Sequence, residues 1–309
     1  MDSSLPSSVA AGGLRAGLAW LTYPVMMGGF LALTGWGLQA GVNPATLAIG
    51  LTVGNFFLLV GLEQAMPREP RHNLFRDPQL VNDAAHGVSR QVLGRPIADA
   101  IRVLVVVGSA TKLQQLGYVG LWPTDASLVP QLLLGILAWS FGDYWVHRAL
   151  HAFTPLWWFH AVHHDTAEMH VLKSGRLHFG EEVIGGVCVP LPLLALGAPP
   201  EIVLWMQLWT VFDGNLAHSN VDQRFPSWAH YVLGTAHLHW IHHAADRRLQ
   251  DSNYSGSTPI WDILFGTFNH PDRNPIDRYG LEEAYVPAGF LGQLAFPFRA
   301  QRKPPTQPT

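Results

Sequence analysis

Two long segments near the start of the chain carry almost no charge, and they restrict the environments in which it folds. Leu18 to Leu38 and Ala45 to Leu62 are each close to the roughly 20 helical residues that cross a bilayer core of about 30 Å. Charged residues make up only 13% of the sequence, against about 25% in soluble domains. Buried helices of a soluble protein are the alternative, but two such runs in tandem are rare in soluble folds. The sequence therefore predicts an all-α, integral-membrane helical bundle.

Two further apolar segments are weaker candidates for membrane spans. Ile101 to Leu121 is interrupted by Arg102 and Lys112, so it either spans or lies at the interface with its lysine reaching toward water. Leu128 to Val146 predicts a further span that ends just before the first histidine group. Together with the first two segments, these give about four spans.

The second half of the chain has two shorter apolar runs, Val183 to Leu196 and Ile202 to Val211. Each is short for a full span, and Gly197-Ala198-Pro199-Pro200 separates them, which predicts a re-entrant or shallow hairpin over 183–212. We expect a single membrane domain over 15–298. The small, polar segment 1–14 and the Pro-rich segment 299–309 are predicted to be disordered tails.

Basic residues are distributed unevenly along the chain. The 63–99 loop, the histidine-rich segments and the C-terminal tail carry Arg or Lys, whereas the connections 39–44 and 122–127 carry none. The positive-inside rule places both termini and a histidine-rich helical cap, residues 147–182 and 213–280, in the cytoplasm. The net charge of −3 gives no sign of nucleic-acid binding. The single cysteine, Cys188, excludes a disulfide framework and a cysteine-based zinc site.

Histidine is the anomalous residue of the composition, because most of the 16 histidines fall within 147–243. Three tight groups stand out: HRALH at 147–151, HAVHH at 160–164 and HWIHH at 239–243. In the first group, spacing of i and i+4 places both rings on one helix face. In each HxxHH group we expect the i and i+3 rings to share a face, with the last ring displaced around the helix.

Eight imidazoles exceed what one catalytic zinc or iron ion binds, so the array predicts a dinuclear metal site. Imidazole suits iron, zinc, copper and nickel. The HExxH motif of metalloproteases is absent, because no Glu directly follows the first histidine of any group. Iron activates O₂ for oxidation of an unactivated C–H bond, and a membrane site offers lipid as substrate. We therefore expect two iron ions, which zinc could replace in a purified sample.

Other residues are candidates for supporting roles. Asp143 lies four residues before His147 and is expected to accept the second ring N–H of a ligand histidine, or else to be a helix-end charge at the interface. His218 is a candidate ninth ligand, and His178 and His237 are weaker candidates. Several other residues are expected to be solvated, supporting, interfacial or uninvolved: Asp165, Glu168, His170, the aromatic run Trp157, Trp158 and Phe159, and His72, His86, His230 and His270.

The series HRALH, WWFHAVHH, RLH, HLHWIHH and NYSGSTPIWDILFGTF, over Leu128 to Phe268, resembles the fatty acid hydroxylase / sterol desaturase superfamily. The resemblance implies a non-haem di-iron centre, O₂ as co-substrate and an external electron donor. Arg176 and the Trp261-Asp262 pair fall on familiar positions, and Asp262 is expected to fix the C-terminal segment against the site. The resemblance also implies the metal ligands His147, His151, His160, His163, His164, His239, His242 and His243, and in some members a histidine at the position of His218.

The chain departs from the family pattern at Asp165, His170, Phe179 and Ser255. These positions lie beside the ligands, so they bear on substrate choice more than on metal binding. No cytochrome b5-like domain is expected in the sequence, so electrons are expected from a separate ferredoxin- or cytochrome-type protein.

The favoured function is an O₂-dependent hydroxylase or desaturase of a membrane lipid, with hydroxylation preferred. The alternatives are a non-catalytic membrane protein that binds metal and a zinc hydrolase at the membrane interface, which would need a carboxylate base and no O₂. The 63–99 loop and the 183–212 hairpin are expected to form the mouth of the site. The sequence leaves the lipid, the position oxidised and the oligomeric state open.

Overall fold

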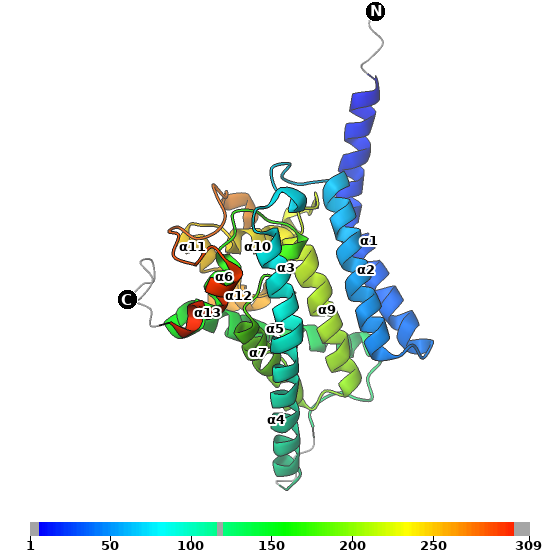
Figure 1. The fold of residues 1–309 in the computed structure, drawn as a ribbon. Helices are drawn as coiled ribbons and strands as arrows, with labels where there is room; N and C mark the ends of the chain where they lie inside the picture. The colour runs from blue at the N-terminus through cyan, green and yellow to red at the C-terminus, as the bar shows by residue number, and fades with distance from the viewer. Residues whose placement is uncertain (1–5, 116–119, 300–309) are drawn as a thin grey trace, which may run out of the picture.

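The computed structural model describes residues 6–115 and 120–299, and it is built from helices joined by short loops (Figure 1). Outside the helices, β-type backbone pairing in the described residues consists of two isolated β-bridges. The prediction of an all-α chain is thus confirmed. The longer helices are α1 (Pro6–Gln39), α2 (Pro44–Ala65), α3 (Leu80–Ser89), α4 (Arg95–Gln115), α5 (Leu128–Ala152), α6 (Thr154–His164), α7 (Phe179–Cys188) and α9 (Pro200–His218). The shorter ones are α8 (Leu191–Leu196), α10 (Ala236–His242), α11 (Arg247–Gln250), α12 (Ile260–Phe265) and α13 (Phe290–Ala295), with η1 (Leu74–Arg76), the π-helical η2 (Arg90–Gly94), η3 (Val171–Gly175), η4 (Ser227–Tyr231), η5 (Pro271–Arg273) and η6 (Phe296–Phe298).

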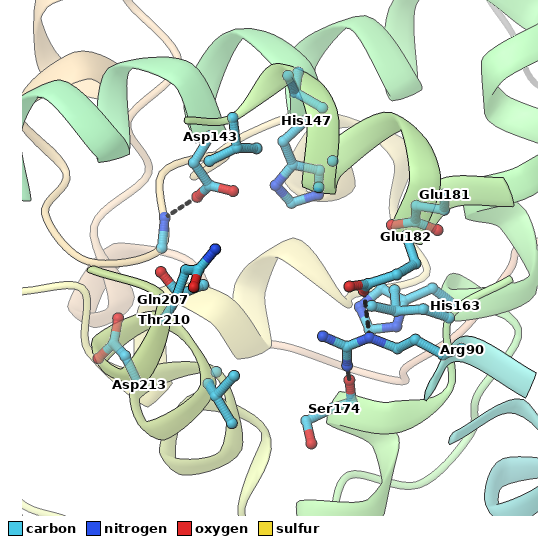
Figure 2. A pocket seen from close by; sticks show the side chains of 18 of the residues that line it. Arg90, Asp143, His147, His163, Ser174, Glu181, Glu182, Gln207, Thr210 and Asp213 are labelled. Atoms are coloured by element: carbon cyan, nitrogen blue, oxygen red, sulfur yellow. Dashed lines mark hydrogen bonds and ion pairs between the residues drawn. The ribbon is translucent and has the colours of Figure 1, made fainter. Parts of the chain in front are cut away.

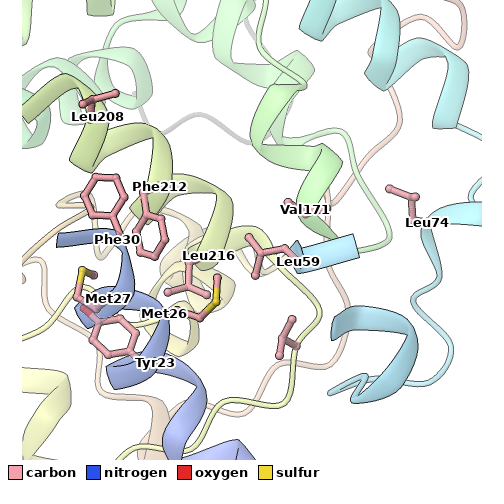
Figure 3. Packing of buried hydrophobic residues seen from close by; sticks show 11 residues of the cluster. Tyr23, Met26, Met27, Phe30, Leu59, Leu74, Val171, Leu208, Phe212 and Leu216 are labelled. Carbon is pink, nitrogen blue, oxygen red and sulfur yellow. The ribbon is translucent and has the colours of Figure 1, made fainter. Parts of the chain in front are cut away.

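Helices α1 and α2 form an antiparallel pair whose buried face packs on α9. Phe30 of α1 stacks on Phe212 of α9 with ring centroids 4.4 Å apart, and Leu59 of α2 is fully buried in the same cluster (Figure 3). Asn43 begins α2 by accepting hydrogen bonds from the backbone N–H groups of Ala45 and Thr46, as expected of an N-cap residue. This cluster holds the membrane-like helices against the helix that carries His218.

Three helical stretches are long and apolar enough to cross a membrane: Gly13–Gln39, Pro44–Ala65 and Phe179–Leu196. The outer faces of α1 and α2 leave large apolar side chains exposed, among them Leu21, Val25, Trp36 and Phe57. An exposed apolar surface of this extent is typical of contact with lipid rather than with water. The first two stretches agree with the segments expected from the sequence.

The remaining expectations for the membrane region differ from the structure. Residues 101–121 and 128–146 lie largely in α4 and α5, but neither helix is apolar enough to count among the candidate spans. The third candidate instead covers α7 and α8, which the sequence assigned to the first arm of a hairpin. Residues 6–14, which the sequence analysis assigned to a disordered tail, form the first turns of α1. Most of the predicted C-terminal tail, from residue 300 onward, lies outside the described residues.

Four helices, α5, α6, α9 and α10, meet beside the membrane-like pair and bring the histidines together (Figure 1). Close packing at this junction depends on small residues. A side chain at Gly142 of α5 would lie 2.1 Å from the carbonyl oxygen of Val189, and one at Gly234 would lie 1.5 Å from that of Gly256. Both contacts are far inside van der Waals distance, so these positions require glycine.

Candidate metal centre

The first histidine group joins five rings from three helices. His147 and His151 come from α5, His160 and His164 from α6, and His242 from α10. The Nε2 atom of His160 lies 3.0 Å from that of His147 and 3.1 Å from that of His164. The Nε2 atoms of His164 and His242 are 3.0 Å apart. All five ligand atoms lie within 4.8 Å of one another, so they face one common point.

The second group joins four rings: His163 of α6, His218 at the end of α9, His239 of α10 and His243 just beyond it. The Nε2 atom of His218 lies 3.2 Å from that of His163 and 2.9 Å from that of His239. The Nε2 atoms of His239 and His243 are 3.1 Å apart. All nine histidines given as metal ligands by the sequence analysis are thus brought together, in two adjoining groups.

The division of the HxxHH motifs differs from the expectation. His160 and His164 belong to one group, and His163 between them belongs to the other; likewise, His239 and His243 share a group that excludes His242. Residue i+4 is displaced from residue i by about 40° around an α-helix, whereas residue i+3 is displaced by about 60° in the opposite direction. In each motif the i, i+4 pair points at one group, and the ring displaced to the other group is the i+3 histidine rather than the last one.

The other ring nitrogens show that this arrangement fits a bound cation. The Nδ1 atoms of His147, His242 and His218 lie 2.7, 2.8 and 2.7 Å from the carbonyl oxygens of Tyr254, Ser252 and Gly214. A carbonyl oxygen only accepts, so Nδ1 carries the hydrogen and Nε2 of the neutral ring is left with a lone pair. Facing lone pairs about 3 Å apart repel unless a cation lies between them.

The protonation states agree with metal binding. Burial, reinforced by neighbouring imidazoles, holds the pKa of His163 and His239 well below the usual range, and it lowers the pKa of His242 to about 3. These rings are neutral at pH 7, as ligands must be. With metal–nitrogen bonds of about 2.0–2.1 Å, nitrogens about 3.0 Å apart subtend nearly a right angle. Five ring nitrogens within 4.8 Å of one another exceed the four ligands of tetrahedral zinc.

Two weaker candidates from the sequence lie outside both groups. Both nitrogens of His178 are occupied, because Nδ1 accepts from the Gly180 N–H and Nε2 lies 3.0 Å from the carbonyl oxygen of Leu294. His237 packs its ring against Phe225 and His230 instead. The structure therefore supports neither of the two as a ligand.

The three supporting residues have different roles from one another. Asp143 makes no hydrogen bond to a ring nitrogen within residues 6–115 and 120–299; one of its oxygens accepts from the Gly256 N–H at 3.0 Å. Asp262 accepts from the N–H groups of Tyr254 and Ser255, so it fixes the loop whose carbonyl orients His147, as expected. The backbone carbonyl of Arg176 lies 3.2 Å from Nδ1 of His163, while its guanidinium is fully buried.

The sequence analysis missed two carboxylates that orient ligands. Glu181 lies 2.7 Å from Nδ1 of His160, and Asp251 lies 2.9 Å from Nδ1 of His151. Their separations along the chain, 21 and 100 residues, follow no helical period. The sequence feature that could have identified Glu181 is the Glu181-Glu182 pair at the start of an otherwise apolar run.

A third set of metal-type side chains is a buried ion-pair network. Asp77, Asp83 and His170 lie close together, but the Lys173 ammonium lies between the carboxylates, 2.5 Å from Asp77 and 2.6 Å from Asp83. Arg176 contacts Asp83 at 2.6 Å. Since a cation already occupies the position, we do not assign this set to a metal. His170, expected to be solvated or to support the site, is instead buried in this network, against Asp77.

The aromatic run before the second motif is not interfacial. Trp157 is fully buried, with its ring 5.0 Å from that of His151 and 5.5 Å from that of His164. The Arg247 guanidinium covers its other side, 4.5 Å from the ring centroid. Trp157 thus forms a wall of the first group, and Trp158 is also buried.

A cavity of about 290 Å³ opens against both groups, between α4, α5, α7 and α9. His147, His160, His163, His218 and His239 line it, so both histidine groups contribute to its surface. Figure 2 shows Asp143, Gln207, Thr210 and Asp213 along one side and Arg90, Glu181 and Glu182 along the other. Arg90 and Arg95, from the expected 63–99 loop, and several residues of the expected hairpin do line the cavity.

Glu181→Gln provides a test of ligand orientation. The amide keeps an acceptor but loses the charge that strengthens the hydrogen bond from His160, so we expect metal affinity to fall about 10- to 100-fold. A competition titration with a chelator measures the change. Glu201→Gln, in the exposed first turn of α9, is the control and should leave the affinity unchanged; equal affinities in both variants would contradict the role of Glu181.

Comparisons with known proteins agree with this geometry. A fatty acid hydroxylase family model matches residues 132–267. The chain is 36% identical over 238 residues to ornithine lipid hydroxylase OlsE of Rhizobium tropici, covering 76% of this chain and 71% of that protein. It is 27% identical over 155 residues to alkylglycerol monooxygenase of Xenopus tropicalis, covering 48% of this chain and 32% of that protein.

A third relative is the very-long-chain aldehyde decarbonylase GL1-10 of Oryza sativa subsp. japonica, 30% identical over 148 residues, with 47% of this chain and 48% of that protein covered. The chain therefore spans less than half of these last two relatives. No solved structure matches the chain.

Proposed function

This chain belongs to the fatty acid hydroxylase family, and from that premise we propose that it is an O₂-dependent hydroxylase of a membrane lipid with two iron ions. The observation that carries the proposal is the pair of histidine groups, neutral and facing inward, on the wall of one cavity. Hydroxylation is preferred to desaturation because relatives are named as a hydroxylase and a monooxygenase.

The proposed ligands are His147, His151, His160, His164 and His242 in one group, and His163, His218, His239 and His243 in the other. Iron in such nitrogen sites supplies the O₂ chemistry that oxidises a C–H bond. Overall, the substrate C–H and O₂, with two electrons and two protons, give an alcohol and water. The electrons are proposed to come from a separate ferredoxin- or cytochrome-type protein.

The chain's own groups hold the ligand rings in place. Glu181, Asp251 and the carbonyl oxygens of Tyr254, Ser252 and Gly214 accept from the Nδ1–H groups and thereby point Nε2 inward. Asp262 holds the loop that carries Tyr254, and Trp157 packs against the rings of His151 and His164. We further propose that the cap faces the cytoplasm, because Arg68, Arg71 and Arg76 lie in the loop that packs against it.

The proposal predicts a defined change in lipid mass. Cells that express the gene should contain a lipid with one more oxygen atom than in cells without it, and the purified, iron-loaded protein should consume O₂ only with lipid and reductant present. Comparative lipidomics and an oxygen electrode measure both. Loss of two hydrogens instead would assign desaturation, and lipid cleavage without O₂ uptake would support a zinc hydrolase and overturn the proposal.

A further inference from the structure

The charged residues that line the cavity divide into paired and unpaired side chains. Arg90 forms an ion pair with Glu182 and donates to the carbonyl oxygen of Ser174, and Arg102 pairs with Asp99 at 2.5 Å. Glu181 is bound to Nδ1 of His160. The remaining charged side chains, Asp143, Asp213 and Arg95, line the same cavity without an ion-pair partner among residues 6–115 and 120–299.

Asp143 lines the cavity and lies one helical turn before the proposed metal ligand His147 on α5. The Gly256 N–H holds one of its oxygens at 3.0 Å. The other makes no hydrogen bond within the described chain, and Figure 2 shows this carboxyl group at the cavity beside His147. An apolar group that displaced water from the cavity would leave this carboxylate without a partner, which disfavours binding of such a group.

Arg95 lies at the start of α4, across the cavity from α5. Its side chain is half-buried and makes no hydrogen bond in the parts of the chain that the structure describes. A guanidinium presents a rigid fork of donors that matches a carboxylate or a phosphate. The cavity thus offers a free anion and a free cation on walls formed by different helices.

We propose that the cavity binds a zwitterionic lipid headgroup, with its ammonium group at Asp143 and its anionic group at Arg95. The inference rests on the proposed function, because it names the substrate class of the same site. The cavity volume of about 290 Å³ lies at the lower end of small-ligand pockets, about 300–1,000 Å³, and so suits a headgroup rather than a whole lipid. Headgroup charges, more than the acyl chains, then select the substrate.

The first test uses the metal-loaded wild-type protein in a neutral detergent at pH 7, with calorimetric titration as the readout. N-palmitoyl-lysine carries both charges, N-palmitoyl-norleucine lacks the ammonium, and N-palmitoyl-lysine methyl ester lacks the carboxylate. We expect the first to bind about tenfold more tightly than either analogue, which corresponds to about 1.4 kcal/mol. Equal affinity for the three lipids overturns the proposal.

Two further ligands test whether the anion that binds is a carboxylate or a phosphate and whether the charges belong to a lipid headgroup. Tight binding of palmitoyl lysophosphatidylethanolamine would also support a zwitterionic headgroup and would assign the anion to phosphate. Free lysine that binds as tightly as N-palmitoyl-lysine would overturn the lipid headgroup as the source.

Two variants assign the charges to residues. Asp143→Asn keeps an acceptor for the Gly256 N–H and removes the charge; it should weaken binding of N-palmitoyl-lysine about tenfold and leave N-palmitoyl-norleucine unchanged. Arg95→Gln should weaken N-palmitoyl-lysine similarly and leave its methyl ester unchanged. Asp246→Asn and Arg248→Gln, which remove the same charges from an exposed pair in the cap, are the matched controls and should not change either affinity.

Metal content and O₂ uptake separate this inference from the proposed function. Wild-type protein that holds metal and hydroxylates neutral and zwitterionic lipids equally well would overturn the headgroup assignment and leave the hydroxylase standing. Charge-selective binding, lost in Asp143→Asn, without O₂ uptake on any lipid would support the headgroup site and overturn the hydroxylase. A variant with the wild-type metal content is folded, so its affinities test the site directly.

Discussion

His239→Ala is expected to lose the metal of its own histidine group, keep the metal of the other, and lose hydroxylation by about 100-fold or more. The reason is geometric: Nε2 of His239 lies within 2.9 Å of that of His218 and 3.1 Å of that of His243, so it is central to the four-ring group. Losing a direct ligand should exceed the roughly 10- to 100-fold cost of losing a group that only orients one. Elemental analysis of the purified protein and product analysis measure the two effects.

His242→Ala is the complementary variant, because His242 belongs to the five-ring group although it lies three residues away on the same helix. It should lose the other metal. His237→Ala is the control, since His237 is also on α10 but packs against Phe225 and His230. Full metal content in His239→Ala or His242→Ala would contradict the assignment, as would metal loss in His237→Ala.

The results expected for His239→Ala and His242→Ala depend on a grouping of the histidines that spacing along the chain does not predict. Local spacing selects eight of the nine histidines that meet, because i, i+3 and i+4 contacts are properties of a single helix, whereas His218 belongs to no such group. It does not fix how α5, α6, α9 and α10 rotate relative to one another, and that rotation decides which ring joins which group. The position of His163 beside His218, 55 residues away, is a result of helix packing.

The orienting groups were harder to predict for the same reason. Asp143 was expected to serve His147 because the two share a helix face, but the carbonyl oxygen of Tyr254 takes that role from a loop 107 residues away. Backbone carbonyls carry no signal in the sequence, since every residue has one. In the membrane region, hydropathy identified α1 and α2, whose outer faces expose large apolar side chains. Helices α4 and α5 are not among the candidate spans, and their cavity-lining faces include Arg95 and Asp143.

Asp83→Ala should be the most destabilising of the variants that spare every ligand. Asp83 is fully buried and contacts both the Lys173 ammonium and the Arg176 guanidinium, each at 2.6 Å. Removing the carboxylate takes one of two counterions from each buried cation, since Lys173 keeps Asp77 and Arg176 keeps Asp165. Breaking a buried pair costs about 3–5 kcal/mol. We expect the melting temperature in detergent to fall by about 10 °C. Asp246→Ala, in the exposed pair with Arg248, is the control and should cost about 1 kcal/mol or less.

The same variant links stability to the metal site, because Asp83 holds the residue whose backbone carbonyl lies next to Nδ1 of His163. Asp83→Ala should therefore also weaken metal binding in the four-ring group more than in the five-ring group. Adding Lys173→Met removes one of the two cations that lose a counterion and should restore part of the lost stability, which a double-mutant cycle quantifies. A melting temperature within about 2 °C of wild type, or no recovery in the double variant, would show that this network does not hold η3 against the site.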